Sequence, residues 1–474
     1  MSVSSSSVRL FVGRIATMVL NFAALAYFAR ALGSADLGVF FLFQAALSML
    51  VLVSDIGLST AVEKRLSAGS GRSVFWTGAM LMGGIASVLS LGLVLFRDVA
   101  AGFLGADLAL TLVVALGLSV AQRLLNAALR GELRTGELAS LTIAETAVQY
   151  GVAAVLVWSG LGAEALVVGV LLGLTVSDLW ALVKVRPAPA TPTKDDADSL
   201  LEYAKYNAIP TVGLQVHNWM DVLIIGVFLA QSDVGAYEVA WRVAGATTLL
   251  AGSIGLAIMP QASAWDAEGA GDRVGRLVSA TFVPALLFVI PAVVGALVIG
   301  ADGLRLIFGS EFERASLVLV VLIAGQAPAA VQSIVGRTLL GLDRPNLVAR
   351  ATIVSIVLNL VLNVVLVVQI GLIGAALATT LSFTVGTILR VWYLDDLVPL
   401  TAPTLELGWC GVAATVMGVV LFVLDRFVTI ESITVLLGFV LLGSTIYGLV
   451  LVAHPSVRRT LLRYARSVVP GVAG

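Results

Sequence analysis

The feature of this chain that most limits its fold is a succession of long apolar stretches separated by short polar turns. A helix needs about 20 apolar residues to cross the hydrocarbon core of a bilayer. Stretches of this length occupy nearly all of the 474 residues, and only 12% of the residues are charged, against roughly 25% in soluble domains. Because lipid cannot hydrogen-bond to exposed backbone, the sequence predicts an all-α polytopic membrane protein.

We expect about fourteen transmembrane helices. The turns between them are short and contain Gly, Ser, Asp and Pro, so helices that are neighbours in the sequence should run antiparallel. The expected ranges are 8–33, 37–66, 73–96, 108–131, 137–159, 163–185, 201–230, 234–265, 275–300, 314–341, 346–369, 371–397, 404–425 and 431–453.

A short motif with an Asp-x-Gly core occurs twice, at 32–40 and at 230–237, each time between two apolar stretches. Its Asp and Gly are expected to shape a turn at the outer rim. Six expected helices separate the copies, an even number, so both have the same orientation. The repeat predicts two pseudo-symmetric six-helix lobes and two C-terminal helices outside the duplication. Further matches in the same order are 56–58 with 254–256, 131–134 with 341–344, and 160–166 with 371–377.

The repeat and the polar segments predict five parts. The segment from Arg186 to Ser199 carries three prolines and an acidic cluster, which are typical of a linker. Lys and Arg favour one side of the membrane by roughly four to one, which predicts cytoplasmic N- and C-termini in a multi-pass protein of the cell membrane. The parts are an N-terminal six-helix lobe (1–185), a cytoplasmic linker (186–200), a C-terminal six-helix lobe (201–400), two extra transmembrane helices (401–453) and a basic cytoplasmic tail (454–474).

Several function classes are disfavoured by the sequence. The net charge of −1 provides no general basic surface for nucleic acid. The single cysteine, Cys410, lies in an apolar stretch and cannot form an intramolecular disulfide. There is no Walker motif, no HExxH and no cluster of Cys and His, so we expect neither an enzyme nor a cofactor or metal centre.

The seventh expected helix carries a polar stripe. Its members recur at spacings of four, four, three and three residues, which places them on one helical face. Such a stripe either bonds to neighbouring helices or lines a water-filled cavity, and its carboxylate favours the cavity. The members are Asn207, Thr211, Gln215, Asn218 and Asp221.

Arg123 and Arg242 lie deep in their expected helices. A buried guanidinium either pairs with a buried acid or binds an anionic ligand, and both interpretations stay open here. The acids at membrane depth, which are also the candidates for binding a coupling proton or sodium ion, are Asp55, Asp221, Glu145 and Asp178.

The first expected helix has Arg14 and Asn21 on one face. Arg14 either faces the interior or extends to the cytoplasmic headgroups. Arg30 lies near the outer end, where it is either an interfacial anchor or a ligand contact. A further stripe in the eleventh expected helix, Thr352, Ser355, Asn359 and Asn363, is interpreted as helix packing.

The order of several short motifs resembles that of the polysaccharide flippases of the multidrug/oligosaccharidyl-lipid/polysaccharide superfamily. The motifs are Ala29–Gly33, Asp36–Gly38, Ser54–Leu58, Asp221–Gly226, Asp233–Tyr237 with Trp241–Arg242, Met259–Pro260 and Gly341–Pro345.

The resemblance implies that the protein moves a polyprenyl-linked oligosaccharide to the outer leaflet by alternating access. By position it implies that Arg14, Arg30, Arg123 and Arg242 hold the lipid phosphate or pyrophosphate. Asn21 and the amides and hydroxyl of the polar stripe (Asn207, Thr211, Gln215 and Asn218) suit sugar hydroxyls. The resemblance also implies that the two extra helices, in 401–453, form a groove for the lipid tail.

Alternatives remain at this point. One is a cation-coupled multidrug exporter of the same superfamily, and another is a non-transporting scaffold that binds a glycolipid. A membrane-embedded glycosyltransferase would need a long outer loop, and the longest expected outer loop, Ala301 to Arg314, is too short. The expected partners are a lipid-linked oligosaccharide, membrane lipids, H+ or Na+, and a glycan polymerase or glycosyltransferase.

Overall fold

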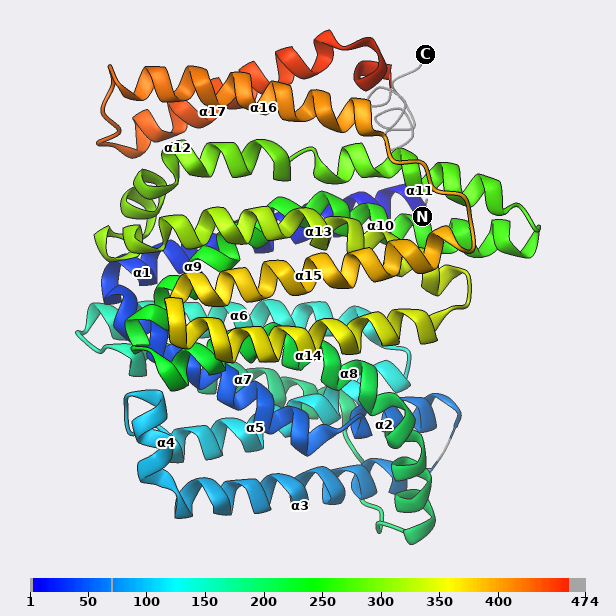
Figure 1. Ribbon diagram of the computed structural model, residues 1–474. Helices are drawn as coiled ribbons and strands as arrows, with labels where there is room; N and C mark the ends of the chain where they lie inside the picture. The colour runs from blue at the N-terminus through cyan, green and yellow to red at the C-terminus, as the bar shows by residue number, and fades with distance from the viewer. Residues whose placement is uncertain (1–2, 70, 460–474) are drawn as a thin grey trace. The chain divides into compact units, whose positions relative to one another are not determined.

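The computed structural model describes residues 3–69 and 71–459, without the side chains of residues 3–18, 135, 206–214 and 217. The described residues form helices joined by turns, with no strand among them (Figure 1). The contacts divide the chain into two compact units, Met1–Gly235 and Ala236–Gly474.

The first unit contains eight helices and the start of a ninth. Helix α6 packs along α7, and α5 packs on α7, α2 and α3. Helix α8, the seventh expected span, packs on α1, α2 and α3 and so belongs to this unit. The helices are α1 (Val3–Asp55), α2 (Leu58–Ser67), α3 (Ser73–Leu95), α4 (Arg97–Leu104), α5 (Ala109–Gly131), α6 (Thr135–Trp158), α7 (Ala163–Val185), α8 (Lys194–Phe228) and α9 (Gln231–Gly245).

The second unit begins within α9. Helix α15 packs on α14 and α13, and the last two helices pack on each other and on α12. Its elements are η1 (Ala246–Thr248), α10 (Leu249–Ala267), α11 (Gly271–Leu286), α12 (Val289–Phe308), η2 (Ser310–Ala315), α13 (Ser316–Gly341), α14 (Pro345–Ile370), α15 (Leu372–Asp395), α16 (Thr404–Asp425) and α17 (Ile433–Ala453).

The all-helical membrane architecture is confirmed. Each of the fourteen expected ranges overlaps a helix, and twelve helical spans among the described residues are long and apolar enough to cross a membrane. One of the twelve, Val19–Asp55, contains a break at Gly33, whose φ of 80° and ψ of 179° are not helical. This span therefore covers residues 19–33 of the first expected helix and most of the second.

The expected outer loop from Ala301 to Arg314 is wrong. Helix α12 continues to Phe308 and the 3-10 helix η2 follows at once. The helix persists because Leu304 and Phe308 are buried on one face. Arg305 also stabilises it by donating to Asp302 one turn earlier and to the carbonyl of Ile430.

The sequence repeat is visible in the backbone of each unit. At the ends of α5 and α13, Leu133 and Asp343 both adopt the left-handed conformation, with φ of 59° and 55°. The N–H of Arg134 then bonds to the carbonyl of Leu129, and that of Arg344 to the carbonyl of Leu339, both at 2.9 Å. This is the same helix-terminating motif twice. The match of 131–134 with 341–344 therefore encodes a shared turn.

The proline-rich segment from 187 to 193 lies in no helix and is docked on α3, while α8, which starts at Lys194, includes the end of the predicted linker. The indole N–H of Trp76 donates to the carbonyl of Ala188 at 3.0 Å, and the N–H of Thr193 donates to the hydroxyl of Thr77 at 3.2 Å. Thr193 then caps α8, because its hydroxyl accepts from the N–H of Asp196. The segment thus places the start of α8 beside the first unit's helices.

Candidate functional site

The two Asp-x-Gly copies contact each other within the first unit. A Cβ added at Gly38 would overlap the carbonyl of Gln231, and one added at Gly235 would overlap the carbonyl of Ser34. Ser34 and Gln231 are separated by the same 197 residues as Gly38 and Gly235, so each glycine meets the equivalent carbonyl of the other copy. The prediction that these glycines shape a turn is wrong, because Gly38 lies inside α1 and Gly235 inside α9 and neither has a positive φ; they instead allow the two backbones to approach each other.

Asp55 and Arg123 form a buried ion pair. Their Oδ2 and Nη1 atoms are 3.1 Å apart, with 2% of the Asp55 side chain and 36% of the Arg123 side chain exposed. Asp55 is the last residue of α1, and the helix breaks directly after it, where Ile56 and Gly57 have positive φ before α2 begins at Leu58. There Ser59 donates its N–H and its hydroxyl to the two carboxylate oxygens, at 2.7 and 2.8 Å.

These contacts provide hydrogen-bond donors to both oxygens of Asp55, but they use only one of the N–H donors of Arg123. The carboxylate receives three donors, whereas Arg123 shows one hydrogen bond, through Nη1, among the described residues. A guanidinium carries five N–H donors. Arg123, whose side chain is 36% exposed, therefore retains donors that could bind a phosphate oxygen while the pair with Asp55 stays formed.

Arg242 pairs with an acid that the sequence argument missed. Its Nε donates to Oε1 of Glu238 at 2.9 Å, and the exposed fractions of the two side chains are 39% and 7%. The signal was the spacing of four residues along one helix, which places the two side chains on the same face. The acids considered as partners were all on other helices.

Glu145 and Asp178 lie on α6 and α7, whose backbones approach closely. A Cβ at Gly173 would lie 2.9 Å from the carbonyl of Glu145. The amide N–H of Gln122, from α5, donates to Oε2 of Glu145 at 2.6 Å and lies 3.5 Å from the hydroxyl of Ser177. Asp178 is buried, and neither of its carboxylate oxygens has a hydrogen-bond partner among the described residues.

The remaining candidate residues show single contacts or only a degree of burial. Asn21 accepts a hydrogen bond from the hydroxyl of Tyr150 at 3.0 Å. Arg30 and Asn218 are exposed and Gln215 is half-buried. Asp221 is buried. The side chains of Arg14, Asn207 and Thr211 lie outside the described part of the structure.

The stripe on α14 packs against α15, as predicted. The hydroxyl of Ser355 donates to the carbonyl of Ser382 at 2.9 Å, and the amide of Asn359 donates to the hydroxyl of Thr379 at 3.1 Å. The stripe also receives a residue that sequence reasoning missed. Arg390, only 4% exposed, donates to the hydroxyl of Thr352 at 2.6 Å.

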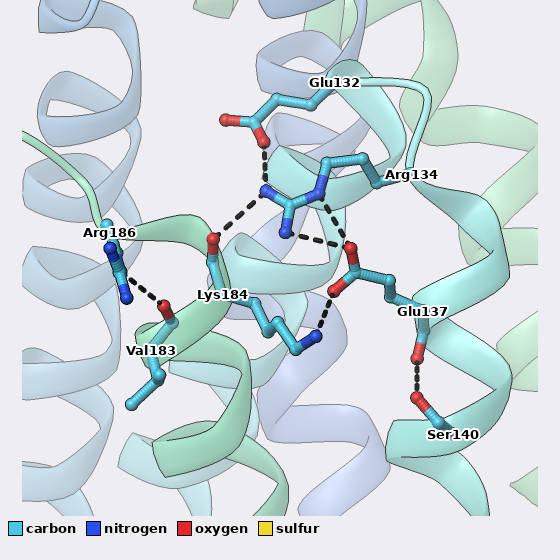
Figure 2. A network of polar contacts seen from close by, with 7 residues as sticks. All are labelled: Glu132, Arg134, Glu137, Ser140, Val183, Lys184 and Arg186. Carbon is cyan, nitrogen blue, oxygen red and sulfur yellow. Dashed lines mark hydrogen bonds and ion pairs between the residues drawn. The ribbon is translucent and has the colours of Figure 1, made fainter.

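An exposed ionic network joins the turn before α6 to the end of α7 (Figure 2). Arg134 bonds to Glu132 at 2.7 Å, to Glu137 at 3.0 Å and to the carbonyl of Lys184 at 3.1 Å, while the Lys184 ammonium lies 3.3 Å from Glu137. The hydrogen bonds to Glu132 and Glu137 raise the pKa of Arg134 above its ordinary value. The network fixes α6 against α7 on the side that the charge bias predicts to be cytoplasmic.

Comparisons with known proteins agree with this architecture. The family described as "Polysaccharide biosynthesis protein" matches residues 27–317. A Haloferax volcanii protein named "Probable low-salt glycan biosynthesis flippase Agl15" is 38% identical over 471 residues, which is 99% of this chain and 100% of that protein. A second protein of that organism, named "Probable flippase AglR", is 31% identical over 94% of this chain and 93% of its own length.

Solved structures share the fold at low sequence identity. The lipid II flippase MurJ in an inward closed conformation matches with a TM-score of 0.81 and 15% identity, over 94% of this chain and 98% of that one. An inward-facing multidrug resistance transporter of the MATE family and the MOP superfamily matches with a TM-score of 0.63 and 13% identity, over 79% of this chain and 93% of that one. With its family match and two near-full-length relatives, the chain belongs to the polysaccharide biosynthesis protein family.

Proposed function

We propose that this protein is a flippase that moves a polyprenyl-(pyro)phosphate-linked oligosaccharide from the cytoplasmic to the outer leaflet of the cell membrane. The observation that carries the proposal is the near-complete alignment with two relatives that are both named flippases. The all-helical fold supports it, because the described residues leave no soluble domain of useful size to hold another activity. The protein would act as a transporter without a catalytic site.

The polar groups of the described membrane helices suit such a substrate. The remaining donors of Arg123 and the partly exposed side chain of Arg242 are the groups that we assign to the phosphates. Asn21, held by Tyr150, and Gln215 and Asn218 are assigned to sugar hydroxyls. Arg14, Arg30, Asn207 and Thr211 complete the proposed substrate-binding set.

The organisation predicted from the sequence is kept within this proposal. Six-helix lobes at 1–185 and 201–400, joined by the linker at 186–200, would alternate between inward and outward access, with both termini in the cytoplasm. The helices of 401–453 would hold the lipid tail. Asp55 already accepts three donors, so we assign any coupling ion to Glu145 and Asp178 rather than to Asp55. Asp221 stays a candidate on its burial alone.

Reconstitution tests the proposal. The protein is placed in liposomes that contain a fluorescent polyprenyl-phosphate-linked oligosaccharide, and a membrane-impermeant reductant then bleaches the outer leaflet. We expect bleaching of the label in both leaflets with the protein and of one leaflet in empty liposomes. Transport of a fluorescent cationic drug instead of the glycolipid would favour the multidrug exporter. Binding of the glycolipid without transport would favour a scaffold.

A further inference from the structure

The carboxylate of Asp178 is the most unusual polar group among the described residues of the first unit. It is 8% exposed, and both of its oxygens lack a hydrogen-bond partner among the described residues. It belongs to α7, inside a span that is apolar enough to cross the membrane. An ionised carboxylate without donors is very unfavourable in such an environment, so the group needs a positive charge or a proton.

Among the described side chains, Asp178 has a second acid in its surroundings and no Lys or Arg paired with it. Its carboxylate lies within electrostatic range of Glu145. On α5, Arg123 is directed to Asp55, which α1 contributes. On α6, Glu137 is held at the helix end by Arg134 and Lys184. No Lys or Arg among the described side chains forms an ion pair with Glu145 or Asp178.

The neutral neighbours distinguish the two acids. Glu145 receives the amide N–H of Gln122 at 2.6 Å, which stabilises its ionised form. The same N–H group lies 3.5 Å from Ser177, beside Asp178. An amide that presents its N–H side would repel a metal ion. In addition, the described residues contain no group of three or more His, Cys, Asp or Glu that could hold a metal.

We propose that Glu145 and Asp178 form a proton-exchange site, in which Asp178 carries the exchangeable proton and Glu145 stays ionised. The inference rests on the flippase function proposed above and names its coupling ion. When water reaches the site, the O–H bond of the Asp178 carboxylic acid breaks and the proton passes to a water molecule, leaving a carboxylate and a hydronium ion. The reverse transfer reloads the site. The charge difference between the two forms links transport to the proton gradient.

Infrared spectroscopy of the purified protein tests the proton itself. We expect a carboxylic acid C=O band at neutral pH that is lost in Asp178→Asn and kept in Asp178→Glu. Asp55→Asn is the matched control, because the ion-paired Asp55 carboxylate contributes nothing to this band. An unchanged band in Asp178→Asn would overturn the proposal. This measurement does not depend on the identity of the transported lipid.

Liposomes containing the labelled lipid-linked oligosaccharide test the coupling. A pH difference of one unit shifts a one-proton equilibrium by up to about tenfold, and we expect this stimulation to disappear in Asp178→Asn. Equal transport with and without the gradient in the unmodified protein, or stimulation by a sodium gradient instead, would refute proton coupling. If the unmodified protein moves no labelled lipid at all, the flippase proposal fails, and the infrared result still decides whether the proton is present.

Discussion

Variants of the Asp55–Arg123 pair can test two roles of Arg123 separately: its stabilising ion pair with Asp55 and its proposed binding of the substrate phosphate. Arg123→Ala removes one of the three donors to Asp55, whose side chain is 2% exposed. Breaking a fully buried pair costs about 3–5 kcal/mol. The two hydrogen bonds from Ser59 remain, and 36% of the Arg123 side chain is exposed, so the expected loss is smaller, about 2 kcal/mol.

The double variant Arg123→Ala/Asp55→Asn reveals the origin of this loss. Because the neutral amide needs no cation, we expect it to recover more than half of the stability lost in Arg123→Ala. The assay is thermal unfolding in detergent, where 1 kcal/mol corresponds to about 2–4 °C for domains of 150–250 residues. Both variants should still lose glycolipid transport, because both lack the guanidinium.

Two results would refute this reasoning. If the double variant is no more stable than Arg123→Ala, the two side chains are not coupled and the ion pair contributes nothing. If the double variant transports the glycolipid normally, the remaining donors of Arg123 do not bind phosphate. Arg97→Ala is the matched control, since Arg97 pairs with Asp107 at the surface, where 54% and 59% of the two side chains are exposed.

Three further predictions follow from single contacts. Gly38→Ala should lower the thermal midpoint and transport, because its Cβ would overlap a backbone carbonyl, whereas Gly102→Ala, which meets no atom within 4 Å, should change neither. Arg242→Ala should abolish glycan display while a blot still detects the protein in the membrane, and normal surface glycan would contradict the assigned role of Arg242. Thr193→Ala should cost about 1 kcal/mol by removing the cap of α8, and faster amide exchange at residues 194–197 checks it.

The transmembrane pattern could be predicted because hydropathy and turn residues act locally. Gly160, for example, adopts a φ of 93° at the end of α6, where the sequence placed a turn. The Asp55–Arg123 pair was among the predicted alternatives, since a deep guanidinium needs a partner. The choice between Asp55 and the other acids was not predictable, because it depends on the helix break at Ile56 and Gly57, which directs Asp55 toward Ser59.

Other contacts could not be predicted from the sequence, because no residue spacing or composition indicates them. Arg390 was not among the residues singled out from the sequence, yet it lies buried against Thr352, 38 residues earlier in the chain. The unsatisfied state of Asp178 depends on which donors α5 and α6 supply, and the sequence does not fix the rotation of these helices about their axes. Glu238 is the exception, because its spacing from Arg242 was visible in the sequence.

The structure explains the glycines of the repeated Asp-x-Gly motif by a backbone contact and not by a turn. The sequence predicted a turn at each copy, yet Gly38 lies inside α1 and Gly235 inside α9, and neither has a positive φ. The reciprocal contact, Gly38 on Gln231 and Gly235 on Ser34, requires glycine in both copies at once, because each supplies the carbonyl that the other approaches. This is the geometry of an isologous interface, in which residue i meets j and j meets i. On this argument a larger side chain at either glycine should disrupt the same contact, so Gly38→Ala and Gly235→Ala together should cost less than the sum of the two single changes. Additive losses would instead show that the two contacts are independent of each other.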